Sequence, residues 1–257
     1  MTTMLPDWFN NTPLEEPGPG RFYHTTRRYP LFYLQITKCG CTFLKNLIYY
    51  LDHGALHPNA KRIHAHEQDF VKADLIPRLV LKASPYLFVV VRNPVDRFLS
   101  LYFDKLADTS NDHDARMRQR VSRAAGLDLS PGAGISVHRQ NCLKTLAWFQ
   151  RNLDTKDEGK PNPHWQRQMV RFSHTKGLEA EVLTLDGLSW QLPALLSPLI
   201  PEIEDHMQAV RVRNTSEKLF DKAEFLTPEI IDAVHAVYPM DLEVYRAAAQ
   251  NWAARKP

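Results

Sequence analysis

Two short apolar runs, each followed by a polar turn and then a helical pattern, constrain the fold of this chain most strongly. They cover residues 31–36 (LFYLQI) and 86–91 (YLFVVV). Continuous apolar runs of this length, rich in aromatic and β-branched residues, are typical of strands that are buried on both faces. The two runs therefore predict an α/β fold with a central parallel β-sheet flanked by helices.

The patterns around these runs fit the same architecture. Apolar residues recur at helical spacing in residues 43–51, and again from Asn93-Pro94, a favourable helix start, to Leu106. Residues 108–136 are rich in charge and then in Gly and Pro, which favours a mobile or weakly helical insertion. The remaining predicted elements are a strand at residues 181–185, a polar loop at 156–163, and helices at 140–153, 228–238 and 242–253.

Length and composition predict a single globular domain. The 257 residues fit one α/β domain over residues 21–257, after an irregular arm at residues 1–20. The net charge of +3 is too small to predict nucleic-acid binding. Cys39, Cys41 and Cys142 form neither a disulfide framework nor a set of zinc ligands, so no metal is expected.

No targeting segment or membrane span is visible in the sequence. The first 20 residues contain acidic residues and four prolines but no apolar stretch, unlike a signal peptide. No apolar run reaches the ~18 residues that a membrane-crossing helix needs. We therefore expect a cytoplasmic protein, although a chain trimmed of an anchor would have the same pattern.

The turn at residues 37–42, after the first predicted strand, has the features of an anion site. A strand that feeds a tight turn and then a helix directs backbone N–H groups and the helix dipole to one spot. Lys38 adds a positive charge, Gly40 permits close backbone approach, and Thr42 offers a hydroxyl. The turn lacks the glycine-first pattern of the nucleotide triphosphatase loop. Without other signals, it would be read as an ordinary strand–helix turn.

A second anion site is predicted where the second strand ends. Arg92 follows that strand, and Ser100 lies two turns into the next predicted helix. Ligands of parallel α/β sheets collect at the carboxyl ends of the strands, and a guanidinium can grip a phosphate with two donors. The alternative is that Arg92 pairs with Asp96 while Ser100 faces solvent. Two such sites suit a ligand that carries phosphate at both ends.

Residues 33–45 (YLQITKCGCTFLK) and 89–102 (VVVRNPVDRFLSLY) resemble two blocks of the carbohydrate sulfotransferases. The first block is similar to the 5′-phosphosulfate loop of that family and the second to its 3′-phosphate segment, in the same order and at matching spacing. Residues 162–168 (NPHWQRQ) and 212–218 (VRNTSEK) are similar to a His-Trp block and to a late loop near the donor. The first two blocks carry the resemblance.

The resemblance implies a three-layer, P-loop-NTPase-like fold that binds the donor 3′-phosphoadenosine 5′-phosphosulfate (PAPS), releases the product PAP and needs no metal. It assigns the 3′-phosphate to Arg92 and Ser100. The family often has proline where Thr37 stands here, which alters the loop entry but not its charge. The residues that the resemblance assigns to the 5′-phosphosulfate are Lys38, Cys39, Gly40, Cys41, Thr42 and Phe43, and those that would cover the donor are Arg213, Asn214 and Thr215.

Catalysis requires a group that neutralises developing charge and a base for the acceptor hydroxyl. Lys38 suits the first role, and a histidine, with a pKa near ~6.5, suits the second. The segment His64-Ala65-His66-Glu67 follows the phosphate helix and resembles the base region of uronyl-type 2-O-sulfotransferases. We expect His66 as the base, then His64, with Glu67 as a further alternative. If the segment were extended, both histidines would lie on one side. It can also be read as an ordinary polar loop.

The resemblance implies a hydroxyl-bearing acceptor, with a carbohydrate favoured. Trp165 could stack on a sugar, with His164 beside it as a second candidate base, and Arg167 could bind an acidic acceptor. The alternative is that Trp165 belongs to the core and His164 is its hydrogen-bonded neighbour.

Two other functions compete with sulfuryl transfer. A phosphotransferase, such as a small nucleotide kinase, would need the glycine-first loop and an acidic magnesium ligand, for which Asp186 is the weak candidate. A non-catalytic nucleotide-binding relative would retain the donor site and lack the base. Retention of donor binding without transfer would distinguish such a protein from an enzyme.

Overall fold

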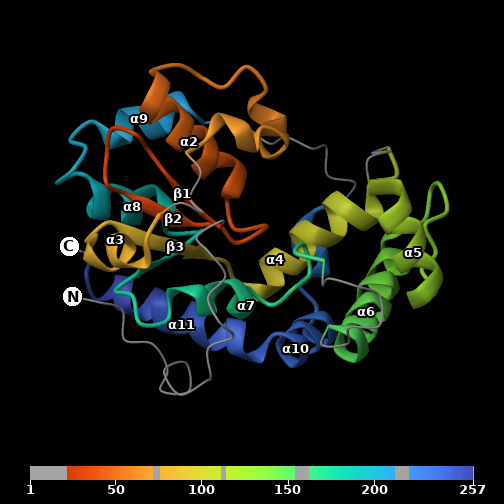
Figure 1. Ribbon diagram of the computed structural model, residues 1–257. Helices are drawn as coiled ribbons and strands as arrows, with labels where there is room; N and C mark the ends of the chain where they lie inside the picture. Colours follow the sequence, from red (N-terminus) through yellow and green to blue (C-terminus); the bar gives the residue numbers. More distant parts are fainter. Residues whose placement is uncertain (1–21, 72–75, 111–113, 154–161, 212–219, 257) are drawn as a thin grey trace. The chain divides into compact units, whose positions relative to one another are not determined.

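The computed structural model describes residues 22–71, 76–110, 114–153, 162–211 and 220–256 (Figure 1). The chain divides into two compact units. The first, which we call the sheet unit, combines residues 1–92, 168–214 and 243–257. The second, the helical unit, combines residues 93–167 and 215–242. Each unit is described by itself below.

The sheet unit is built on four strands in the order β1-β2-β3-β4: β1 (Tyr23–Thr25), β2 (Phe32–Leu34), β3 (Leu87–Val91) and β4 (Glu181–Thr184). Strands β2, β3 and β4 are parallel, with Leu34 opposite Val89 and Val89 opposite Val182. The three predicted strands are therefore confirmed, and so is the α/β class.

The predicted parallel sheet is confirmed for β2, β3 and β4, but the sheet as a whole is mixed, because β1 runs antiparallel to β2. A tight connection joins these two strands, and Thr26 closes it with its side chain. The Thr26 hydroxyl accepts a hydrogen bond from the Tyr29 N–H at 2.7 Å and donates one to the Tyr29 carbonyl at 2.9 Å. A connection this short joins antiparallel strands, whereas parallel neighbours need a long crossover.

Helices cover both faces of this sheet, as the sequence predicts. Side chains alternate along each strand, so Tyr33, Phe88 and Leu183 face one apolar cluster while Leu34 and Val89 face another. The first cluster is closed by α2 (Cys41–His53), α8 (Leu188–Leu196) and α9 (Ile203–Ala209). The second is closed by α3 (Arg78–Ala83), α7 (Gln168–Phe172) and α11 (Pro239–Ala253), of which residues 243–253 belong to this unit.

Helix α2 is sharply bounded, which fixes the position of its first turn. Gly40 and Gly54 flank it, both in the left-handed conformation, and the Gly54 N–H bonds the Tyr50 carbonyl. The segment that follows consists of two short 3₁₀ helices, Ala60–Ala65 and Glu67–Asp69. Asn46 of α2 holds this segment by donating a hydrogen bond to the Ala60 carbonyl at 3.0 Å.

The helical unit has its own apolar core, which includes Phe98, Phe149 and Val234. Residues 108–136 contain a regular helix over Ala115–Ala125 rather than the weakly helical insertion expected. Strong helix formers make up this helix, Val121 is fully buried, and Gly126 ends it. The remaining elements are α4 (Pro94–Leu101), a π-helix (Tyr102–Ala107), α5 (Ala115–Ala125), α6 (Ile135–Asn152) and α10 (Pro228–Val237).

None of the helices in the described ranges combines the length and the apolar character needed to cross a bilayer.

Candidate functional site

The turn between β2 and α2 has an unusual backbone. Lys38 has a φ of 68° and is the one non-glycine residue in the described ranges with a positive φ. Gly40 has a φ of 78°, and a Cβ built there would lie 2.7 Å from Leu185 Cδ1. A side chain at position 40 would thus meet backbone strain and would require the Leu185 side chain to move. Glycine is the residue that lets the turn approach the end of β4 this closely.

The first turn of α2 is suited to an anion. Its N-cap, Gly40, has no side chain that could cap the first N–H groups, and no acidic residue lies in the first turn. The partial positive charge of a helix N-terminus is therefore not offset locally. Lys38, Thr42 and Phe43 are partly exposed around this turn, whereas Cys39 and Cys41 are buried.

The carboxyl ends of the parallel strands converge on this turn. The Arg92 guanidinium donates a hydrogen bond from Nη1 to the Lys38 carbonyl at 3.2 Å. At the next strand, the Leu185 N–H bonds the Val91 carbonyl at 2.8 Å. Lys38 and Arg92 thus share one edge of the sheet. The sequence predicted separate pockets, but here the guanidinium contacts the turn itself.

Gln168, the last residue of the His-Trp block, joins these parts and has no role that the sequence predicted. Its Oε1 accepts the Arg92 N–H at 2.9 Å, and its Nε2 donates to the Arg92 carbonyl at 2.9 Å. The Cys39 thiol donates to the same Oε1 at 3.1 Å. One buried amide therefore fixes both the end of β3 and the turn before α2.

The Cys41 thiol of the turn is buried, which disfavours its thiolate form. Burial raises the pKa of the Cys41 thiol, while the backbone and charge of Lys38 and the charge of Lys45 act in the opposite direction. Because the thiolate is the nucleophilic form, a buried thiol with a raised pKa is unreactive. Cys41 contributes its small size and its backbone N–H group to the turn.

His64 contacts the start of α2 directly. Its Nε2 lies 3.0 Å from Thr42 Oγ1 and 3.5 Å from Cys41 Sγ, and its side chain is exposed. His64 lies in the last turn of the 3₁₀ helix Ala60–Ala65, and His66 separates this helix from the next. The segment is therefore not extended, and the idea that both histidines lie on one side because of a strand geometry is wrong.

Lys45 and Glu67 form an ion pair beside the same segment. The Lys45 side chain is fully buried, whereas that of Glu67 is 60% exposed. The Lys45 ammonium group occupies this carboxylate, so it is less available to accept a proton from a hydroxyl. Glu67 is therefore less suited to the role of base than the two histidines that precede it.

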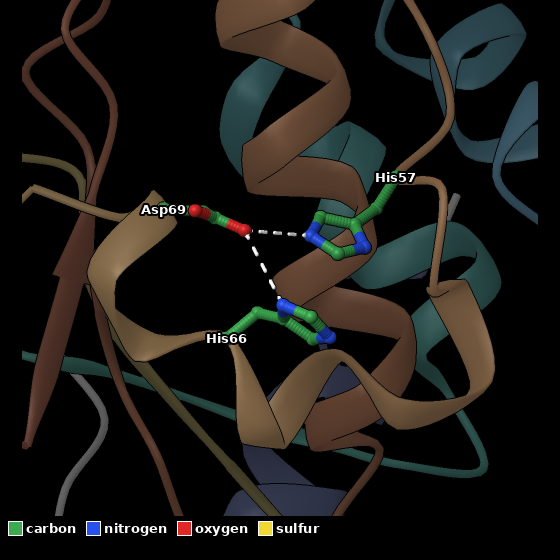
Figure 2. A group of neighbouring side chains, drawn as sticks. All are labelled: His57, His66 and Asp69. Carbon is green, nitrogen blue, oxygen red and sulfur yellow. Dashed lines mark hydrogen bonds and ion pairs between the residues drawn. The ribbon is translucent and has the colours of Figure 1, made fainter.

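His66 belongs to a cluster with His57 and Asp69 (Figure 2). His57 Nε2 lies 3.0 Å from Asp69 Oδ2, and His66 Nδ1 lies 3.7 Å from the same oxygen. The three side chains line a pocket of about 360 Å³ whose other walls include Arg27, Tyr49 and Asn59. Three ligand atoms within 4.8 Å of one another also have the spacing of a metal site. Sequence analysis missed His57 and Asp69, although the i,i+3 spacing of His66 and Asp69 is a helical signal.

The acceptor candidates lie in the helical unit. Trp165 is buried in its core, where its ring stacks on Phe149 with centroids 5.5 Å apart. The backbone N–H of His164 bonds Asn162 Oδ1 at 2.9 Å, and Arg167 Nε donates to the Val237 carbonyl at 3.3 Å. These contacts stabilise the unit internally, in line with the core alternative for Trp165.

The remaining candidates are Ser100 for the 3′-phosphate, Asp186 for magnesium and the residues expected to cover the donor. Ser100 is a partly exposed residue of α4 and also belongs to the helical unit, where Asp96 forms an ion pair with Lys222. Asp186, the candidate magnesium ligand of a kinase, accepts a hydrogen bond from the Tyr245 hydroxyl at 3.2 Å. Arg213, Asn214 and Thr215 lie outside the described residues.

Comparison with known proteins identifies the family. Curated proteins and solved structures give no match. The family model described as "Sulfotransferase family" matches residues 22–246, which span both compact units. The match covers the strand–turn–helix at Lys38, the end of β3 at Arg92 and the His64–His66 segment. The chain belongs to the sulfotransferase family.

Proposed function

We propose that this protein transfers a sulfuryl group from PAPS to a hydroxyl of a carbohydrate or glycoconjugate and releases PAP. One observation carries the proposal: the turn from Lys38 to Thr42, at the uncapped start of α2, meets Arg92 at the end of β3. Membership of the sulfotransferase family supplies the reaction class, a transfer of the sulfuryl group to a hydroxyl-bearing acceptor.

The residues present suit the 5′-phosphosulfate of this donor. Residues in the left-handed conformation, placed between a strand and a helix, point backbone N–H groups toward one spot where an anion can bind. The positive φ of Lys38 and Gly40, and the lack of an acidic residue in the first turn of α2, fit that arrangement. The same features support a P-loop-like fold. We assign the 5′-phosphosulfate to residues 38–43 and the 3′-phosphate to Arg92 and Ser100, with residues 213–215 covering the donor.

The acceptor oxygen attacks sulfur opposite the bridging oxygen of the phosphosulfate. One S–O bond forms, the other S–O bond breaks, and its electron pair leaves on the phosphate of PAP. The acceptor proton passes to a base, for which we propose His66 first and His64 second. Lys38 and the N–H groups at the start of α2 stabilise the charge that develops on the leaving phosphate.

We propose further that residues 21–257 act as one sulfotransferase domain, because the family match spans both units. The acceptor would bind beside the base, and His164, Trp165 and Arg167 remain candidates for contacts with it. The core position of Trp165 favours a supporting role for that residue over direct stacking on a sugar.

The proposal is tested by donor binding and by transfer. Thermal unfolding of the whole protein is measured with 3′,5′-ADP, which is PAP, and separately with ATP plus magnesium. We expect PAP to raise the melting temperature, because a ligand that binds the folded state stabilises it. Stabilisation by ATP plus magnesium alone would favour a phosphotransferase.

Transfer is then measured with labelled PAPS and a panel of carbohydrate and small-molecule acceptors, scored by the mass gain of one sulfate. We expect transfer to a carbohydrate hydroxyl. Binding of PAP without transfer to any acceptor would instead identify a nucleotide-binding protein that lacks catalysis.

A further inference from the structure

The cluster of His57, His66 and Asp69 has a defined hydrogen-bonding order. The backbone N–H of Asn59 donates to His57 Nδ1 at 2.9 Å. Nδ1 of His57 is therefore the acceptor nitrogen of its ring, and the proton of the neutral ring sits on Nε2. That proton points at Asp69 Oδ2, 3.0 Å away. Because the His57 side chain is only 2% exposed, this orientation is fixed by the surrounding protein.

This order argues against a metal at the cluster. A histidine that binds a metal through one nitrogen normally donates the proton of its other nitrogen to an acceptor. If a metal bound His57 Nε2, the proton would have to move to Nδ1, where it would face the N–H donor of Asn59. The N–H groups of Asn59 and of His57 Nδ1 would then face each other at a buried position. The spacing of the ligand atoms fits a metal site, but the hydrogen bond from the Asn59 N–H to His57 Nδ1 does not.

Asp69 also faces the ring of His66. Its Oδ2 faces His66 Nδ1 at 3.7 Å, and the other ring nitrogen, Nε2, lies on the far side of the ring (Figure 2). A neutral ring that turned a lone pair toward this carboxylate would meet electrostatic repulsion, whereas an N–H group there is attracted. The carboxylate therefore favours the tautomer with the proton on Nδ1. Nε2 is then the basic atom of His66.

We propose that Asp69 is a positioning residue that keeps the proton of His66 on Nδ1, and that His57 positions Asp69. This inference rests on the proposed function and refines it. During transfer, Nε2 of His66 takes the proton from the acceptor hydroxyl as the new S–O bond forms. The resulting imidazolium keeps its Nδ1–H facing Asp69 Oδ2, and this contact holds the ring with Nε2 toward the acceptor. No other reactant is needed.

The surroundings support this division of roles. His66 is 27% exposed and lines the pocket, so an acceptor can reach it, whereas His57 is buried behind Asp69. Other charged or titratable groups around the pocket and this segment are Arg27, Tyr49, His53, His64 and the Lys45–Glu67 pair. Of the groups described, Asp69 is the carboxylate within 4 Å of His66.

The first test reads the tautomer and does not depend on activity. Long-range ¹H–¹⁵N NMR of the labelled whole protein reports which ring nitrogen carries the proton, and His66→Gln identifies the signals of His66. We expect neutral His66 to carry its proton on Nδ1 in the unaltered protein and to lose this preference in Asp69→Ala. The matched control is Asp205→Ala, at an exposed aspartate of α9, which should leave the signals unchanged.

The second test measures coupling in the transfer reaction. We expect Asp69→Ala to lower kcat about tenfold or more and to leave the KM for PAPS unchanged. A positioned base contributes about 10²- to 10⁴-fold to the rate, and this loss would be part of that contribution. In a protein that already carries His66→Ala, the same change should have no further effect. Restoration of part of the rate by Asp69→Glu would support the role of the carboxylate.

Three results would overturn the inference. They are a neutral His66 protonated on Nε2 in the unaltered protein, additive losses in the double variant, and stoichiometric zinc binding that requires all three side chains. If the tautomer is as expected and PAPS supports no transfer, the positioning of His66 stands while the proposed function fails. If transfer from PAPS occurs with the opposite tautomer, only the positioning role fails.

Discussion

Lys38 combines a left-handed backbone conformation with a positively charged side chain, two properties that one residue rarely has together. Its backbone takes a left-handed conformation, which costs an L-residue roughly 1–2 kcal/mol. Its side chain supplies the positive charge nearest in sequence to the start of α2. A glycine would fit the backbone better and lose the charge. Strain at this position is therefore the cost of having a cation at the anion site.

Substitution of Lys38 separates the two properties. Both Lys38→Ala and Lys38→Gly should reduce sulfuryl transfer by about 100-fold or more, because both remove the charge that stabilises the leaving phosphate. Lys38→Gly should be more stable than Lys38→Ala by about 1 kcal/mol, because glycine adopts a positive φ without strain. Denaturant unfolding and transfer from labelled PAPS measure the two effects. Near-normal transfer by Lys38→Ala would remove the residue from the mechanism.

At the scale of elements, Gln168 of α7 has a close counterpart in Gln191 of α8. Both amides are buried, and both bond the polar groups at the carboxyl end of a strand. Gln168 bonds the backbone of Arg92 after β3, and Gln191 bonds the N–H and the hydroxyl of Thr184 in β4. One of the two also reaches the turn at Lys38, through the Cys39 thiol.

This pair allows a matched comparison. Gln168→Leu and Gln191→Leu should each lower the free energy of unfolding by about 2 kcal/mol, because each leaves buried polar groups without partners. Gln168→Leu alone should also weaken PAP binding, since it releases the turn and Arg92. Melting curves with and without PAP measure both quantities. Equal loss of PAP stabilisation in the two variants would contradict the special role of Gln168.

The elements that sequence predicted are those with continuous apolar patterns. The apolar runs at residues 31–36 and 86–91 are typical of buried strands. The turn residues around Lys38 and Asn93 indicate where the following helices begin. Strand β1 was missed because it is three residues long and includes His24 and Thr25, whose polar atoms bond Gln35 and the Leu31 carbonyl.

The same reasoning explains which parts of the site were found. Strand ends of a parallel sheet meet at one edge, so the sequence could place Lys38 and Arg92 at the same edge, although it predicted a separate pocket for each. His57 and Asp69 could not, because two irregular 3₁₀ segments bring them together. Their contact depends on the hydrogen bonds by which Asn46 and Asn59 hold those segments, and no periodic sequence pattern predicts such bonds.

At the scale of the whole molecule, the buried His24 links folding to pH. Burial, together with the charge of Lys45, lowers the pKa of His24 from 6.5 to about 4. The unfolded chain therefore binds a proton at a higher pH than the folded protein does. The stability that neutral His24 contributes is complete above pH 6.5 and is lost as the pH falls toward 4.

From pH 7 to pH 5 we expect this residue alone to lower the free energy of unfolding by about 2 kcal/mol. His24→Gln, which does not titrate and can still bond Gln35, should flatten that part of the stability curve by a similar amount. Denaturant unfolding at a series of pH values provides the measurement. An unchanged slope in His24→Gln would show that other groups cause the acid sensitivity.

The contact of the Thr42 hydroxyl with His64 Nε2 has a consequence for the order of events in a catalytic cycle. A hydroxyl has a single hydrogen to donate, so while it donates to the imidazole it cannot also donate to an arriving anion. An anion that takes this hydrogen obliges His64 to turn away or to present an N–H in its place. If the first substrate is the anionic donor that we propose, its binding would change the orientation or the tautomer of His64 before the acceptor binds, which favours ordered over random addition.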